Sequence, residues 1–160
     1  MSEEEKYTQE EAHKMFARTF FGKTWELLEK ADRSELEDEL MVHAAHASNY
    51  HWLQVGTGLN HQRGEWLIAR AYSVLGLGGA ALKHTKRCLA LTEKYADLME
   101  DFDLAFAYEG AARANAIASN QEEAQKYIQL AQDAGEKIGD KKDREYFFKD
   151  FEAGDWKGLK

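Results

Sequence analysis

The chain has 160 residues, of which 44% are hydrophobic and 31% charged, and its formal net charge at pH 7 is −8. This length suits one folded domain over 1–160, and the composition excludes a disordered chain. Because nucleic acids and anionic membrane surfaces are bound through basic faces, the acidic balance disfavours both as partners.

Capping signals and glycines predict the ends of seven helices. Thr8 followed by Glu11, and Ser34 followed by Glu37, have the spacing of N-terminal capping boxes. Gly76-Leu77-Gly78-Gly79 follows a helix and lacks a Lys-Ser/Thr pair, so we expect a turn there and not a phosphate loop. The alternation typical of a half-buried strand is absent. In chain order, the predicted helices cover about 8–30, 34–55, 59–75, 80–99, 101–118, 120–138 and 143–152.

The sequence resembles itself at an offset of 43 residues. Ala69-Arg70-Ala71 recurs as Ala112-Arg113-Ala114, and Ala81-Leu82-Lys83 recurs as Ala124-Gln125-Lys126. A period of this size in a chain of helix formers predicts stacked helical hairpins. Phe16-Ala17-Arg18 is similar in type to the residues that begin at Ile68, which predicts a longer first hairpin. The expected architecture is therefore all-α, with antiparallel hairpins over about 8–55, 59–99 and 101–138 and a capping helix over about 143–152.

The last predicted helix carries an aromatic face. Phe147, Phe148 and Phe151 are spaced three or four residues apart, which places them on one side of a helix. The final hairpin of such a stack needs a cover, so we expect this helix to pack on the two before it, with Trp156 holding the tail. The alternative is that these aromatic side chains reach a second subunit and form a homodimer.

The first complete repeat resembles the tetratricopeptide-repeat family. It has Ile68-Ala69 and the aromatic Tyr72 on its first helix, Gly76 at the turn and Ala81-Leu82 on its second helix. The second repeat is similar, with Ser119 in the place of the glycine. The resemblance implies a short right-handed solenoid that binds a protein or peptide. The whole chain also resembles stand-alone bacterial proteins of this type, which carry no assigned activity. The period exceeds the usual length of about 34 residues, which implies longer helices.

The same resemblance implies a role for the arginine that follows each repeated alanine. In this family that position faces the concave groove, so Arg18, Arg70 and Arg113 are expected to form a row along one surface. Arg63 lies two turns before Arg70 and joins the row. Guanidinium groups bind carboxylates through two parallel hydrogen bonds, which favours a partner that carries carboxylates.

A second interpretation of these arginines is pairing within the chain. Glu109 precedes Arg113 by four residues, as in an ordinary surface ion pair, and Trp66 precedes Arg70 by four, as in a stacking contact. The candidate ligand-binding groove consists of Arg18, Arg63, Trp66, Arg70, Glu109 and Arg113.

Three histidines on the second predicted helix are the alternative site. His43 and His46 lie one turn apart, as two metal ligands can, whereas His51 lies on another side of the helix. A third ligand would have to come from elsewhere, with His61 and His84 as candidates. Because no metal-binding motif is present, we expect histidines that are hydrogen-bonded in a helix interface, and neither metal nor cofactor.

The sequence therefore favours a protein- or peptide-binding scaffold over an enzyme. The alternatives are a metal-dependent or small-molecule enzyme that uses the histidines of the second helix, and a self-associating structural protein. Met1–Lys6 is acidic, unlike a signal peptide, and no apolar run approaches the length of a membrane span. Cys88 is the single cysteine, and its apolar surroundings predict a small core residue. We expect a cytoplasmic protein.

Overall fold

The computed structural model describes residues 3–160 and is all-helical over that range, which confirms that the fold is all-α. Seven α-helices are present in these residues, as the sequence predicts. They are α1 (Gln9–Glu29), α2 (Glu35–Val55), α3 (Gly58–Val74), α4 (Gly78–Lys94), α5 (Asp101–Ile117), α6 (Gln121–Glu136) and α7 (Lys141–Glu152), with a 3₁₀ turn, η1 (Ala96–Leu98), after α4.

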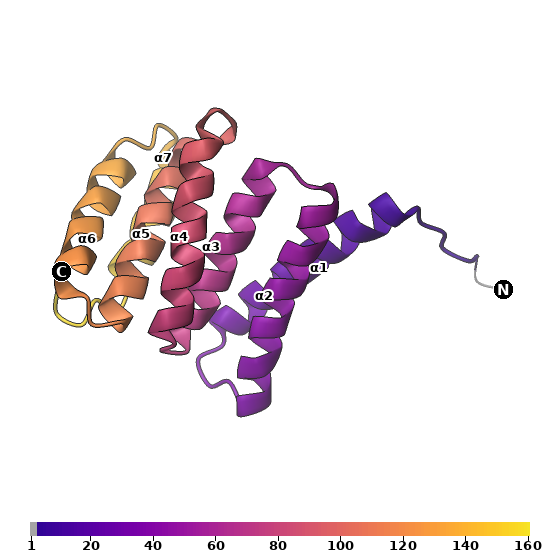
Figure 1. The fold of residues 1–160 in the computed structure, drawn as a ribbon, viewed down its shortest axis with the longest axis horizontal. Coiled ribbons are helices and arrows are strands. Elements are labelled where there is room, and N and C mark those ends of the chain that lie inside the picture. Colours follow the sequence, from indigo (N-terminus) through magenta and orange to yellow (C-terminus); the bar gives the residue numbers. More distant parts are fainter. Residues whose placement is uncertain (1–2) are drawn as a thin grey trace.

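The helices pack in two layers. Each helix from α1 to α6 contacts the next one in the chain, and α3 also contacts both α1 and α5. One layer therefore contains α1, α3 and α5, and the other contains α2, α4 and α6. Figure 1 shows α1 and α2 at one end of the molecule and α6 at the other, with α7 beside α5. Helix α7 packs on α5 and α6.

The 43-residue offset is visible in the helix positions. Helices α3 and α5 each have 17 residues and begin 43 positions apart, and α4 and α6 begin at the same offset. Gly76 and Ser119 also lie 43 positions apart, and their φ angles are 74° and 63°. Both turns between paired helices therefore pass through the left-handed region, which glycine enters at little cost and serine does not.

The fourth predicted helix has different bounds from those expected. It begins at Gly78 and not at 80, so Gly78 and Gly79 belong to its first turn and not to the loop. A Cβ at Gly78 would lie 2.9 Å from the Cα of Ala118, so the glycine serves a close helix approach. The helix ends at Lys94, and 96–98 form η1, because Tyr95 leaves the helical region with φ −114° and ψ 34°.

The small residues that recur along the sequence lie in the core. Ala17, Ala69 and Ala112, which the sequence aligns with one another, are all fully or almost fully buried. Cys88 is buried as predicted, and burial raises the pKa of its thiol to about 12. No helix within residues 3–160 has both the length and the apolar character needed to cross a membrane.

The aromatic face of α7 is covered by its own chain. Phe147 and Phe151 are fully buried against residues of α5 and α6, and Trp156 packs on Phe151 and donates its Nε1–H to the Phe151 carbonyl at 2.9 Å. The prediction that this helix packs on the two before it, with Trp156 holding the tail, is confirmed.

Candidate functional site

Four residues from α3, α5 and α7 form an arginine cluster, defined as Arg70, Glu109, Arg113 and Asp150. Arg70 donates two hydrogen bonds to the Asp150 carboxylate, at 2.8 and 3.2 Å, and its Nη1 lies 3.4 Å from Glu109. Arg113 donates to Glu109 through Nε and to the Asp150 carbonyl at 2.9 Å. Arg70 and Arg113 therefore converge on the same two acidic residues, and both of these belong to this chain.

The arginine cluster is an internal contact. Glu109 is fully buried, and only 11% and 13% of the Arg70 and Arg113 side chains are exposed. The expected surface pair between Glu109 and Arg113 is thus a buried pair, because α7 covers it. Burial acts to lower the pKa of Arg70, but the Glu109 and Asp150 charges outweigh burial and raise it. Arg70 also lies over the Trp66 ring, at 5.9 Å from its centroid, as the second interpretation expects.

Arg18 does not join this cluster. It is exposed on α1 and borders a shallow hollow with Tyr7, Glu11 and Lys14. Of the three aligned arginines, the structure thus brings Arg70 and Arg113 together and leaves Arg18 outside the cluster.

Arg63 forms an ion pair with an acid of α5. Its Nε and Nη2 atoms donate to the two carboxylate oxygens of Asp103, at 2.9 and 3.0 Å, and its guanidinium lies over the Phe102 ring. Asp103 is almost fully buried and also accepts from the backbone N–H of Glu100. About a third of the Arg63 side chain, 36%, is exposed. The ion pair uses Nε and Nη2, and Nη1 makes no hydrogen bond within residues 3–160.

Beside this ion pair lies an aromatic hollow that we name the inner pocket. Its volume is about 220 Å³. The Trp66 ring is the lining residue that contacts both other walls, at 5.7 Å from the Trp25 ring and 5.7 Å from the Phe106 ring. The Trp66 Nε1–H donates a hydrogen bond to the Phe106 carbonyl. Three helices of one layer and α7 supply the lining residues, which are Phe21, Trp25, Gln62, Arg63, Trp66, Phe102, Asp103, Phe106 and Tyr146.

Gln62 borders the inner pocket and carries a buried acceptor that has no partner among the described residues. Its side chain is 1% exposed, and its Nε2 donates to the Thr92 hydroxyl at 2.9 Å. Thr92 gives its own proton to the Cys88 carbonyl, so its hydroxyl can only accept from Gln62, which fixes the orientation of the amide. Within residues 3–160, the Gln62 Oε1 has no hydrogen-bond partner. A buried acceptor of this kind favours a ligand that donates.

The histidines of α2 lie in separate environments. His46 Nε2 and the Tyr72 hydroxyl are 2.9 Å apart, whereas His51 Nδ1 lies 2.8 Å from His13 Nδ1. Burial is the main cause that lowers the pKa of both His46 and His51, and the neighbouring histidines, His84 and His13, lower it further. His43 is exposed.

Of the remaining candidate ligands, His84 lies beside His46, with 5.4 Å between the ring centroids, but both candidates pair with other groups. His61 pairs with the Trp52 carbonyl, and His84 lies 2.6 Å from Glu65. No group of three or more potential metal ligands occurs among the described residues. The structure thus does not bring His43, His46 and His51 to one point.

Several residues of this surface were not expected from the sequence. Gln62, Asp103 and Asp150 carry the polar contacts, and Trp25 and Phe106 form walls of the inner pocket. Their positions depend on which helices face one another, and the 43-residue offset does not specify that. The one available signal was the density of aromatic residues at helical spacing in α1, α3 and α5.

The chain was compared with protein-family models, curated proteins and solved structures. None of them matches. The geometry of the inner pocket and the arginine cluster therefore provides the basis for a functional inference.

Proposed function

We propose that the protein is a peptide-binding scaffold of the tetratricopeptide-repeat type, with its partner on the surface formed by α1, α3 and α5. In this proposal the molecule is a short right-handed solenoid of three antiparallel hairpins, capped by α7. The repeated helix positions and the contacts between successive helices support this arrangement. The observation that carries the proposal is the inner pocket, an aromatic hollow lined by all three of these helices.

The size of the inner pocket favours one side chain of a partner over a complete small molecule. Its volume of about 220 Å³ lies below the roughly 300–1,000 Å³ of typical small-molecule sites. Aromatic residues are the most frequent anchors of protein interfaces, and they fill hollows of this kind with large apolar contact areas. Because the Gln62 Oε1 needs a donor, the anchor in this proposal is tryptophan or tyrosine and not phenylalanine.

The rim of the inner pocket favours a carboxylate next to the anchor. Arg63 is held by Asp103 through two nitrogens, which leaves Nη1 to bind a second acid. Arg70 and Arg113 do not take this role, because Asp150 of α7 already occupies them. The partner in this proposal is therefore a segment with an aromatic residue close to Asp or Glu, bound at Arg63.

The two alternative functions have less support. A metal-dependent enzyme would need three ligands at one point, but His46 and His51 pair with Tyr72 and His13 in separate places. Self-association through the aromatic residues of α7 would need them exposed, but Phe147 and Phe151 are buried within the chain.

Selection from a random-peptide library tests the proposal. We expect the enriched peptides to share one Trp or Tyr within a few residues of Asp or Glu. Gln62→Met keeps the length of the side chain and removes the acceptor. The affinity for the selected peptides should therefore fall by about tenfold. Arg18→Ala, an exposed position outside the inner pocket, is the matched control and should change nothing. Selected peptides that bind both variants equally well would refute the proposal.

Three small probes test the chemistry of the inner pocket separately. N-acetyltryptophan has both an indole N–H and a carboxylate, its 1-methylindole analogue lacks the N–H, and N-acetyltryptophanamide lacks the carboxylate. In calorimetric titrations, N-acetyltryptophan should bind more tightly than either of the other two probes. The preference for the N–H should disappear in Gln62→Met, whereas the preference for the carboxylate should persist in that variant. Equal binding of all three probes would exclude the assigned contacts.

A further inference from the structure

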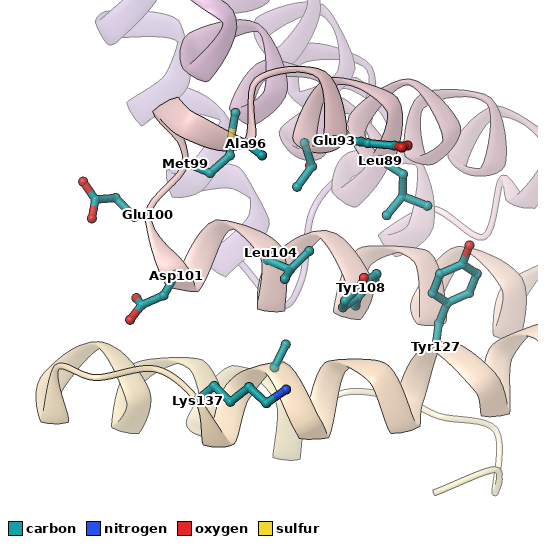
Figure 2. A pocket seen from close by; sticks show the side chains of 12 residues that line it. Leu89, Glu93, Ala96, Met99, Glu100, Asp101, Leu104, Tyr108, Tyr127 and Lys137 are labelled. Atoms are coloured by element: carbon teal, nitrogen blue, oxygen red, sulfur yellow. The ribbon is translucent and has the colours of Figure 1, made fainter.

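A large hollow lies on the opposite layer, between α4 and α6. We name it the outer groove; its volume is about 690 Å³. Helix α5 forms its floor, and Figure 2 shows Leu104 and Tyr108 of α5 lying between Leu89 of α4 and Tyr127 of α6. Leu104 is 39% exposed, which is high for an apolar residue in the middle of a packed layer. Apolar surface at such a position is typical of an interaction site.

The rim of the outer groove is acidic. Glu93, Glu100 and Asp101 border it, against the single ammonium group of Lys137. No ion pair involves these three carboxylates within residues 3–160. Glu100 and Asp101 lie at the N-terminal end of α5, where the helix dipole favours acids. Their presence therefore has a structural reason.

Glu93 has no such reason. It lies in the last turn of α4, where the dipole disfavours a negative charge, and it is exposed beside the apolar floor. A carboxylate that is locally unfavourable for its helix, next to an exposed leucine, is what a basic partner would require. Glu93 thus indicates the sign of the partner's charge.

We infer that the outer groove binds an amphipathic helix that presents leucine-like residues to α5 and Lys or Arg residues to Glu93, Glu100 and Asp101. A helix laid in an apolar groove is a common mode of peptide recognition, read through residues at i, i+3, i+4 and i+7. The lining residues of α5 extend over two turns, so an occupant of about two to three turns fills the groove.

Other occupants fit less well. A second copy of this chain carries a net charge of −8 and would bring like charges to an acidic rim. A small molecule would need buried polar groups to orient it, and among the described residues none of the buried unpaired polar atoms belongs to the outer groove. The basic helix matches both the apolar floor and the charge of the rim. The inference does not depend on the inner pocket.

The test uses two synthetic helical peptides with the same leucine face. One carries Lys at all remaining positions and the other carries Glu. In NMR titrations of the ¹⁵N-labelled full chain, the Lys peptide should shift the amide signals of the groove residues. Its binding should weaken as the salt concentration is raised. The Glu peptide should bind at least about tenfold more weakly. Equal binding of the two peptides, or shifts confined to another surface, would overturn the inference.

Matched variants locate the contact. Glu93→Lys should weaken the Lys peptide by about three- to tenfold, whereas Glu39→Lys makes the same charge change on α2 and should have little effect. Leu104→Ser should weaken binding, whereas Leu53→Ser, at another exposed leucine, should not. Gln62→Met, in the inner pocket, should also leave this binding unchanged. An equal loss in Glu39→Lys and Glu93→Lys would reduce the effect to net charge and refute the site.

Discussion

Glu109 is the residue on which the arginine cluster depends. It is fully buried and faces two guanidinium groups, one from its own helix and one from α3. A buried carboxylate is tolerated only when it is paired, and two arginines in one place need acids to compensate them. Asp150 supplies the second acid but is 23% exposed, so water shares in its solvation. The two carboxylates should therefore contribute unequally to stability.

Glu109→Gln keeps the shape of the side chain and removes its charge. We expect the free energy of unfolding to fall by about 2–4 kcal/mol, because two buried cations then face one acid. Asp150→Asn should lower it by about 1 kcal/mol, since that position is partly solvated. Urea denaturation of both variants measures the difference, and equal losses would contradict the assigned burial.

Ser119 holds a backbone conformation that suits glycine. Its φ of 63° matches the 74° of Gly76 at the same point of the preceding repeat. Ser119→Gly should therefore stabilise the protein by about 0.5–1 kcal/mol, as strain is removed. Gly76→Ala has room for its Cβ but not the right φ, and should destabilise by about 1 kcal/mol. In thermal denaturation, Ser119→Gly should raise the melting temperature and Gly76→Ala should lower it. A change of the same sign in both variants would refute the backbone argument.

At the scale of single residues, the sequence predicted partners better when they were close in the chain. Glu109 with Arg113 and Trp66 with Arg70 are four positions apart, and helical geometry alone brings each pair together. Asp103 with Arg63 and Asp150 with Arg70 are 40 and 80 positions apart. Their pairing depends on how helices are placed, which no local rule contains.

At the scale of the helices, α7 packs against α6 at a glycine, where α6 has no side chain. Gly135 lies inside α6, and a Cβ there would collide with the rings of Phe147 and Phe148. Glycine is unfavourable inside a helix by about 0.5–1 kcal/mol, so its presence here has a packing reason. The missing side chain lets the aromatic face of α7 lie directly on the backbone of α6.

Gly135→Ala should destabilise the protein by about 1–2 kcal/mol, because overpacking outweighs the better helix propensity of alanine. Gly22→Ala is the matched control: it lies inside α1, and nothing is within 4 Å of the position its Cβ would take. That variant should gain about 0.5–1 kcal/mol. Chemical denaturation of the pair checks this, and a stabilised Gly135→Ala would mean that α7 does not pack as described.

Helix starts were predicted well where a cap had a side-chain signal. Thr8 with Glu11 forms the predicted capping box, and Ser34 accepts from the Glu37 N–H. The end of α4 was predicted five residues too late, because no glycine or proline separates it from η1. Gly78 was read as a turn residue, but its function is close contact with Ala118, which only tertiary structure reveals.

For the whole molecule, pH should affect stability through the histidines of α2. In the folded state the pKa of His46 and of His51 is lowered, mainly by burial. The unfolded chain, with an ordinary histidine pKa of about 6.5, then binds more protons than the folded one. The free energy of unfolding should therefore be highest above about pH 6.5 and should fall as the pH drops below that value. Urea denaturation at pH 7.5 and 5.5 measures this decline, which should shrink in His46→Gln/His51→Gln; an unchanged decline would exclude these groups.

The ion pair between Arg70 and Asp150 has a consequence for the order in which the helices unfold. An array of helices that touch only their chain neighbours frays from either end, one helix at a time. This pair joins α3 directly to α7, so the carboxyl end cannot open without breaking a contact in the middle of the chain. Helices α3 to α7 should therefore exchange their amide hydrogens together, as one cooperative unit. Within residues 3–160, α1 and α2 make no ion pair with a helix beyond their chain neighbours, so they should open first. Stepwise exchange that starts at α7 would argue against this order.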